Sequence, residues 1–423
     1  MASPTRLRIL LLAAGCDGTD VGEAWSNFQW VSRLSQIHDV TLLTFRKVNR
    51  PTAIHQLPDA QVVEWLDWPL VGHFDRFNSM VKPGYLGFYF ACRHWIRTAV
   101  ARGTQFDIIH QLSPLALRYP SPATIATVPR VVGPLGGSIT TPRAFCSELH
   151  NSRWYTKLRC IDGWRLHWDP WIRKTLSGAN VVLGVAPYVK ELLAPIPIRR
   201  FEVMGETGVP RLPASLARRN REDGSLRLLF VGRVVRSKGV RDAVRAMGHL
   251  QDLPGVRLDI VGDGEDLEQC QREAAALRLN HRVNFHGRLS RDAVEPYYGA
   301  ADAFLFPSLR EASGNAVLES MSHGLVPIVA SNGGPAFAVT DECGLRIEPK
   351  EPKQFAEDLA NAVRFLVHHP QRMLSMADAA RKRIEQVFLW SRKIDWMNRL
   401  YLDVVQSDAR PPMVSQELVG VCA

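Results

Sequence analysis

Two carboxylates placed eight residues apart are the clearest candidates for chemistry in this sequence. Glu311 lies in a loop rich in Pro, Ser and Gly, and Glu319 lies on a helix that the spacing of apolar residues predicts from Asn315 onward. The apolar run before the loop, residues 303–306, is typical of a buried strand, and residues 325–330 form a second such run. The pattern therefore predicts a strand, a loop, a helix and a further strand in succession.

The loop of this unit occupies a position at which ligands commonly bind. In an open parallel sheet, ligands bind beyond the carboxyl ends of the strands, and a helix start there attracts anions through its unpaired N–H groups and its dipole. An acid at the loop tip suits sugar hydroxyls, and an acid on the core side of the helix suits ribose hydroxyls. Glu319 lies between Leu318 and Met321, which favours a buried, paired or ligand-bound acid over a solvated one. For Glu311, spacing alone leaves a solvated loop acid open.

Two cations form a second candidate group. Arg233 and Lys238 lie in a Gly-Arg-x4-Lys-Gly loop between a predicted strand, 227–231, and a predicted helix, 240–250. Fixed cations in a closed cleft stabilise a departing diphosphate, through the planar fork of Arg and the point charge of Lys. The alternative is two solvated loop cations. Such a pair makes a metal unnecessary, and the sequence has no Asp-x-Asp motif at a strand end, so we predict no metal and no other cofactor.

The Glu-x7-Glu unit and the Met-Ser-His-Gly-Leu-Val-Pro run at 321–327 resemble the retaining glycosyltransferases of family 4, which have the GT-B fold. The resemblance covers almost the whole chain and is strongest over 226–349. The family usually has Gly-Phe-Gly after the first Glu, whereas this chain has Ala312, Ser313 and Gly314. The missing aromatic residue affects the expected shape of the donor-sugar pocket but leaves the unit itself recognisable.

The resemblance implies an α/β chain with two doubly wound Rossmann-like domains that face a cleft. The alternation of predicted strands and helices agrees with this, because it restarts after a stretch rich in Gly, Pro and charge. The expected organisation is an acceptor-side domain at 1–205, a linker at 206–225, a nucleotide-sugar domain at 226–385, a helix crossing back to the first domain at 386–407, and a tail at 408–423.

The resemblance also implies roles for particular residues. Gly22 would present its backbone to the donor phosphates, and His110 would lie near the donor sugar. Without the resemblance, Gly22 is equally well explained as a turn glycine and His110 as a core histidine. His286 and Arg288 close a strand beside the expected nucleobase, although Arg288 is nearly as well explained as a surface residue. The implied catalytic residues are Glu311, His110, Arg233 and Lys238. The implied donor-binding residues are Gly22, Arg233, Lys238, His286, Arg288, Ser313, Gly314, Asn315 and Glu319.

Charge is distributed unevenly along the 423 residues. The net charge is +10, and residues 1–205 hold 23 Lys and Arg against 14 Asp and Glu. The first half therefore favours an acidic partner, whether nucleic acid, anionic lipid or a phosphate-bearing acceptor.

Seven cysteines without a Cys-x-x-Cys motif argue against zinc and disulfides, and no apolar run approaches the ~20 residues of a transmembrane helix. We therefore expect a cytoplasmic protein.

The predicted function is transfer of a sugar from a UDP- or GDP-sugar to a glycan or lipid-linked acceptor, with the retention that the resemblance implies. A nucleotide-sugar epimerase or hydrolase is the alternative, but it needs an acid or base in the first domain, where only His110 and Glu23 are candidates. Nucleic-acid binding is disfavoured because no recognised module or basic helix is present. Tryptophans interleaved with basic residues at 93–102 and 143–174 predict salt-sensitive, peripheral binding to the anionic inner face of the cell membrane.

Overall fold

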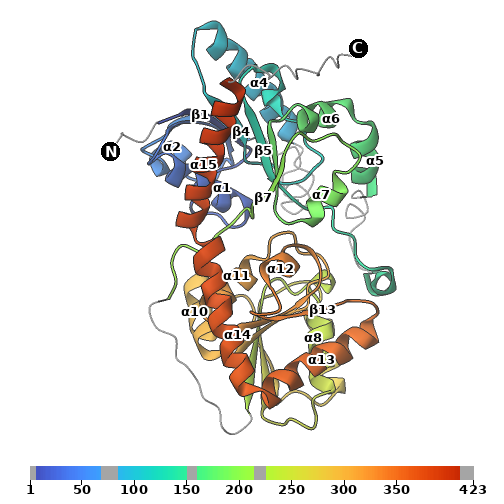
Figure 1. Cartoon of the computed structure of the whole chain (residues 1–423). Coiled ribbons are helices and arrows are strands. Elements are labelled where there is room, and N and C mark those ends of the chain that lie inside the picture. The colour runs from blue at the N-terminus through green and yellow to red at the C-terminus, as the bar shows by residue number, and fades with distance from the viewer. Residues whose placement is uncertain (1–5, 68–83, 150–159, 214–224, 410–423) are drawn as a thin grey trace, which may run out of the picture.

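The computed structural model describes residues 6–67, 84–149, 160–213 and 225–409. Within these residues the chain forms two parallel β-sheets, drawn one above the other in Figure 1. Helices cover both faces of the first sheet, since Ile9 and Leu11 pack on one side and Leu10 and Leu12 on the other. The predicted α/β class with two Rossmann-like domains is confirmed.

The first sheet has seven strands in the order β3-β2-β1-β4-β5-β6-β7. Its core strands are continuous apolar runs, as expected for strands buried on both faces. The strands are β1 (Arg8–Ala13), β2 (Asp39–Arg46), β3 (Gln61–Leu66), β4 (Ile108–Gln111), β5 (Arg130–Leu135), β6 (Val181–Gly184) and β7 (Phe201–Val203). The α-helices are α1 (Glu23–Leu34), α2 (Ala53–Gln56), α4 (Tyr85–Ala101), α5 (Cys160–Trp168), α6 (Pro170–Ser177) and α7 (Tyr188–Leu192).

The second sheet has six strands in the order β10-β9-β8-β11-β12-β13. Its strands are β8 (Leu226–Val231), β9 (Val256–Val261), β10 (Val283–Phe285), β11 (Ala303–Phe306), β12 (Val326–Ala330) and β13 (Leu345–Ile347). The α-helices around it are α8 (Val240–Gly248), α9 (Leu267–Ala276), α10 (Arg291–Ala300), α11 (Asn315–Ser322), α12 (Gly333–Ala338) and α13 (Pro352–His368). The predicted strand–loop–helix–strand unit is confirmed as β11, α11 and β12.

Each sheet reverses its strand order at one place. In the first sheet β1 pairs with both β2 and β4, and in the second sheet β8 pairs with both β9 and β11. A crevice opens beyond the carboxyl ends of the strands at such a point. The loops that follow β8 and β11, which carry the predicted cations and the first predicted acid, are therefore neighbours.

The end of the chain crosses from the second domain to the first, but not as one continuous helix. Helix α14 (Pro370–Arg383) continues through a π-helical turn to Phe388, and the chain is extended at Leu389 before α15 (Trp390–Ala409) begins. Leu389 pairs with Val209, so both connections between the domains run side by side at this break. Helix α15 then packs against the first domain (Figure 1), where Trp390 lies edge-on to Trp30 with ring centroids 5.0 Å apart.

Several predicted boundaries differ from the observed elements. The crossing helix begins at Trp390 and ends at Ala409, whereas 386–407 was expected, so the tail predicted from 408 starts two residues too early. Most of the predicted linker, 214–224, and the rest of the tail, 410–423, lie outside the described residues.

Candidate functional site

An ion pair between Lys238 and Glu311 joins the two loops at the reversal point of the second sheet. Lys238 ends the 3₁₀ turn η4 (Arg236–Lys238) after β8, and its ammonium donates to Glu311 Oε2 in the loop after β11. The two side chains are 13% and 19% exposed. The structure thus brings together a predicted cation and a predicted acid at one half-buried position.

The η4 turn is held against the β11 loop by its backbone. The Leu309 N–H donates to the Ser237 carbonyl over 2.9 Å. Gly239 follows with φ 73°, and a Cβ there would lie 2.0 Å from the Pro307 carbonyl oxygen. Only glycine tolerates both this left-handed backbone and this approach. The spacing of Lys238 from Glu311 is therefore fixed by packing as well as by charge.

The Glu311 carboxylate also binds backbone donors at the start of α11. The Gly314 N–H donates to Oε1 over 3.3 Å. Burial raises the pKa of Glu311, but the Lys238 ammonium and hydrogen bonds from the Gly314 and Ser313 N–H groups outweigh it, so the pKa lies below its usual value. Glu311 is therefore ionised at neutral pH, with an acceptor arrangement suited to hydroxyl donors.

The first turn of α11 faces the same loop. Gly314 is the N-cap, with φ 81° and ψ 48° and no side-chain cap. Asn315, the first residue of the helix, has a buried Oδ1 with no hydrogen-bond partner among the described residues. A buried polar atom without a partner costs free energy and is typical of a position that a ligand satisfies. The arrangement can therefore bind a polar or anionic group at the helix start.

The first domain covers this loop with the segment that follows β5. A Cβ at Gly136 would lie 3.6 Å from the Ala312 Cβ, and a Cβ at Gly333 would lie 2.8 Å from Ile139 Cδ1. The Gly137 N–H donates to the Tyr188 hydroxyl over 3.0 Å. Burial raises the pKa of Tyr188, and the charges of Glu206 and Glu311 add to the effect. Tyr188 was missed in the sequence, where nothing distinguishes it from other tyrosines.

His110 is placed differently from the expectation of contact with a sugar. It is fully buried at the end of β4, with Nδ1 2.5 Å from the Tyr401 hydroxyl on α15 and Nε2 2.6 Å from the Gly133 carbonyl oxygen. Burial lowers the pKa of His110 to about 4, against a smaller opposite effect of the Gly133 carbonyl. Both ring nitrogens are occupied, so in this conformation the neutral ring joins β4, β5 and α15 and offers no atom to a substrate.

Glu319 is partly exposed and paired. Its side chain is 39% exposed, accepts from the Tyr298 hydroxyl over 3.2 Å and lies 3.5 Å from the Arg291 guanidinium. Burial raises the pKa of Glu319, and Arg291 and Tyr298 only partly oppose it. The predicted pairing of Glu319 is therefore observed, and its side chain remains partly accessible.

In the described part of the chain, the remaining predicted residues make no hydrogen bond or ion pair with Lys238 or Glu311. Arg233 and Arg288 are exposed and make no ion pair within the described part of the chain. The His286 ring is held by Asp259 Oδ1 at 2.7 Å and by the Tyr297 hydroxyl at 3.1 Å. Gly22 is the N-cap of α1 with φ 67°, and no atom lies within 4 Å of where its Cβ would be, which leaves its backbone accessible.

Comparison with known proteins matches the second half of the chain most clearly. Residues 214–383 match the family described as glycosyl transferases group 1. Glycogen synthase from Mycobacterium tuberculosis (strain H37Rv) is 31% identical over 198 residues, which is 46% of this chain and 47% of that enzyme. The lipopolysaccharide core biosynthesis glycosyltransferase LpsE from Rhizobium meliloti is 31% identical over 137 residues, or 32% and 39% of the two chains. The chain thus spans less than half the length of these relatives.

Solved structures resemble almost the whole chain. Sucrose-phosphate synthase from Thermosynechococcus elongatus has a TM-score of 0.66 at 18% identity, covering 95% of this chain and 100% of that chain. Anabaena HepE in complex with UDP-glucose has a TM-score of 0.60 at 17% identity, with coverage of 95% and 100%. At these identities the likeness establishes the fold. The chain therefore has the GT-B fold, and residues 214–383 match the group 1 glycosyl transferases.

Proposed function

We propose that this protein is a glycosyltransferase that moves a sugar from a UDP- or GDP-sugar to a glycan or lipid-linked acceptor. The observation that carries the proposal is the Lys238–Glu311 pair beside the uncapped start of α11, under a loop of the first domain. The family match over 214–383 supports the same reaction class.

The arrangement supplies the parts that sugar transfer requires. Lys238 and the exposed Arg233 can neutralise the diphosphate as the glycosidic bond breaks, and the α11 start can bind its oxygens. Glu311 accepts from hydroxyls of the transferred sugar, and Glu319 from the ribose. We further propose family 4 chemistry with retention, in which the acceptor attacks from the face that the diphosphate leaves and the departing phosphate oxygen takes the acceptor proton.

The acceptor class is proposed from relatives. Glycogen synthase and a lipopolysaccharide core glycosyltransferase both match the second domain, and HepE was solved with UDP-glucose. These names favour a nucleotide-sugar donor and a glycan or lipid-linked acceptor over an epimerase or hydrolase reaction.

Measurement of donor consumption with and without acceptor tests the reaction class. Purified protein is incubated with UDP-glucose, UDP-galactose and GDP-mannose, alone and with lipid-linked or soluble oligosaccharide acceptors, after calorimetric titration of UDP and GDP. A transferase releases nucleoside diphosphate mainly when acceptor is present. Equal release without acceptor would indicate a hydrolase, and isomerised donor without release would indicate an epimerase.

Metal independence is an expected result of the cationic loop. Because Lys238 and Arg233 supply the positive charge that a divalent ion provides elsewhere, turnover in excess EDTA should equal turnover in buffer with Mg²⁺ or Mn²⁺. Initial rates of nucleoside diphosphate release measure this directly. A loss of rate in EDTA that Mn²⁺ or Mg²⁺ restores would contradict the proposal.

Peripheral membrane association has support in an exposed aromatic surface on the first domain. Trp164 and Trp168 on α5 are 63% and 71% exposed, and Trp171 on α6 is 56% exposed. On α4, Phe90 is 58% exposed. We propose that this surface rests on anionic lipid at the cytoplasmic face of the cell membrane. In the described part of the chain, no helix is long and apolar enough to cross a bilayer. Within the predicted basic stretch 143–174, Arg153, Lys157 and Arg159 lie outside the described residues.

Replacement of Trp164 and Trp168 together by alanine should weaken vesicle binding. Both rings are exposed, so their loss removes interfacial area without opening the core. Co-sedimentation with phosphatidylglycerol and phosphatidylcholine vesicles measures the effect. The control replaces Val48 and Ile54, which are 57% and 52% exposed, by alanine; Ile54 is on α2, on the opposite side of the domain from α5 (Figure 1). Equal binding by the two variants, or equal binding to both lipids, would reject the proposal.

A further inference from the structure

A short segment of the first domain places one side chain, Phe145, in the core of the second domain. The chain descends from the upper domain in Figure 1 to the 3₁₀ segment η2 (Arg143–Leu149), which lies beside the lower domain. Phe145 is fully buried there, edge-on to Phe355 with ring centroids 5.9 Å apart, and the Arg236 guanidinium lies 5.5 Å from its ring centroid. The aromatic ring therefore anchors the segment to the second domain.

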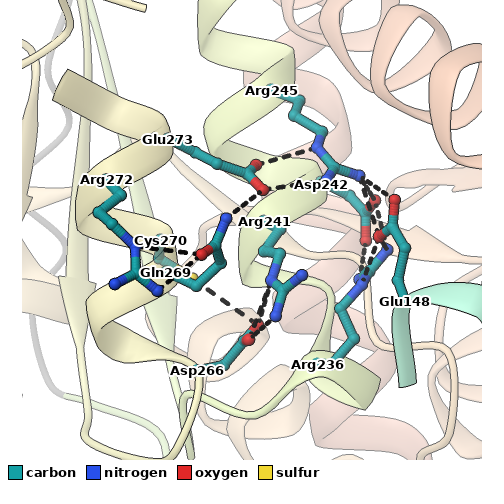
Figure 2. A network of polar contacts seen from close by, with 10 residues as sticks. All are labelled: Glu148, Arg236, Arg241, Asp242, Arg245, Asp266, Gln269, Cys270, Arg272 and Glu273. Carbon is teal, nitrogen blue, oxygen red and sulfur yellow. Dashed lines mark hydrogen bonds and ion pairs between the residues drawn. The ribbon is translucent and has the colours of Figure 1, made fainter. Parts of the chain in front are cut away.

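Glu148, three residues after this anchor, binds two arginines of the second domain. Arg236 Nε donates to Oε2 over 2.7 Å, and Arg245 Nη1 donates to Oε1 over 3.0 Å, as Figure 2 shows. Arg236 also binds fully buried Asp242 through both of its Nη atoms, at 2.6 and 3.0 Å. Arg236 itself is only 6% exposed, so its orientation is fixed by these contacts.

Both arginines that bind Glu148 also have acidic partners within the second domain. Arg236 is paired with Asp242, and Arg245 with Glu273 at 2.9 Å. Loss of Glu148 therefore leaves no buried arginine without an acidic partner, and the second domain can remain folded. This makes the contribution of Glu148 separable from general stability.

Each residue of η4 contacts a different part of the protein. Arg236 binds the first domain through Glu148, the Ser237 carbonyl accepts from the Leu309 N–H, and Lys238 pairs with Glu311. The turn thus links a side chain of the first domain to the loop that carries the candidate catalytic acid. A single residue, Ser237, lies between Arg236, which makes the interdomain contact, and Lys238.

We propose that Glu148 is a positioning residue, which holds the η4 turn more firmly, and so aligns Lys238 with Glu311 more closely, when the first domain is seated on the second. The domain interface then contributes to the order of the diphosphate site. The consequence for catalysis rests on the proposed function, whereas the mechanical link between Glu148 and the Glu311 loop does not.

Hydrogen exchange of the apo protein tests the link without any substrate. Glu148→Ala should speed exchange of the backbone N–H groups of Lys238, Gly239 and Leu309 by about tenfold, the effect of losing one charge-assisted hydrogen bond on local opening. Glu148→Gln, which keeps an acceptor but no charge, should give an intermediate rate. The control Glu268→Ala removes an exposed ion pair with Arg272 on α9 and should leave these amides unchanged.

Nucleotide binding then tests the functional consequence. Glu148→Ala should weaken calorimetric binding of UDP or GDP, whichever binds wild type, and lower kcat more than Glu268→Ala does. Unchanged exchange at Leu309 in Glu148→Ala, or equal changes in Glu268→Ala, would overturn the link. Faster exchange with unchanged nucleotide affinity and kcat would overturn the role in positioning. If wild type bound neither nucleotide, the proposed function would fail while the exchange result still decided the link.

Discussion

Lys238→Ala and Arg233→Ala are expected to lose most turnover and most affinity for nucleoside diphosphate while remaining folded. Each removes a charge-assisted contact to phosphate worth ~1.5–3 kcal/mol, which corresponds to a loss of roughly 10- to 100-fold in affinity. Arg233 is exposed and makes no ion pair with described residues, so its replacement disturbs nothing in the apo protein. Lys238→Ala in addition leaves Glu311 without its cation, so the pKa of Glu311 should rise.

The matched control is Lys350→Ala, which removes the same charge from an exposed position of the second domain. Calorimetric titration with UDP and GDP, initial rates and thermal melting are compared for the three variants and wild type. Wild-type nucleotide affinity in both Lys238→Ala and Arg233→Ala would show that the diphosphate binds elsewhere. Equal losses in Lys350→Ala would show that the effect is one of net charge alone.

Glu311→Ala is expected to lower kcat by about 100-fold with a much smaller effect on nucleotide affinity, because a reacting sugar that loses its positioning contact reacts slowly. Glu319→Ala should instead mainly lower nucleotide affinity, with a smaller effect on kcat, since a ribose contact is common to substrate and transition state. Glu311→Gln keeps the size of the side chain but removes its charge, so it separates the effect of shape from the effect of charge at residue 311. Steady-state kinetics and UDP or GDP titration measure both quantities, and equal affinity losses in both alanine variants with unchanged kcat would contradict this assignment.

The contribution of the Lys238–Glu311 ion pair to stability depends on pH, and the direction of that dependence follows from the pKa of Glu311. The pKa of Glu311 is lower in the folded chain than its ordinary value of 4.5, so the folded state binds its proton less tightly than the unfolded state does. The contribution of the Lys238–Glu311 pair to stability is therefore complete above the ordinary value and is lost as pH falls through the folded pKa. Melting temperatures measured between pH 7 and pH 3 should fall less steeply for Glu311→Gln than for wild type.

The elements around the site were predictable because buried parallel strands are continuous apolar runs. Residues 303–306 and 325–330 are such runs and are observed as β11 and β12. The contacts of His110 were not predictable, since its partner Tyr401 is 291 residues away and a histidine at a strand end gives no sign of its neighbours. Glu148 is likewise 88 residues from Arg236. The break at Leu389 was missed because the apolar spacing continues across it.

The break at Leu389 makes the first domain discontinuous in sequence. Its core includes Trp390 and Tyr401 from α15 as well as strands from the beginning of the chain. A fragment ending near residue 385 would leave Trp30 without its aromatic neighbour and His110 without its hydroxyl partner. A recombinant exchange of nucleotide-sugar domains between related enzymes should therefore join the chains at Val209 and Leu389, where the two crossings pair. In such a chimera the last twenty residues of the described chain, Trp390–Ala409, must come from the same parent as the first domain.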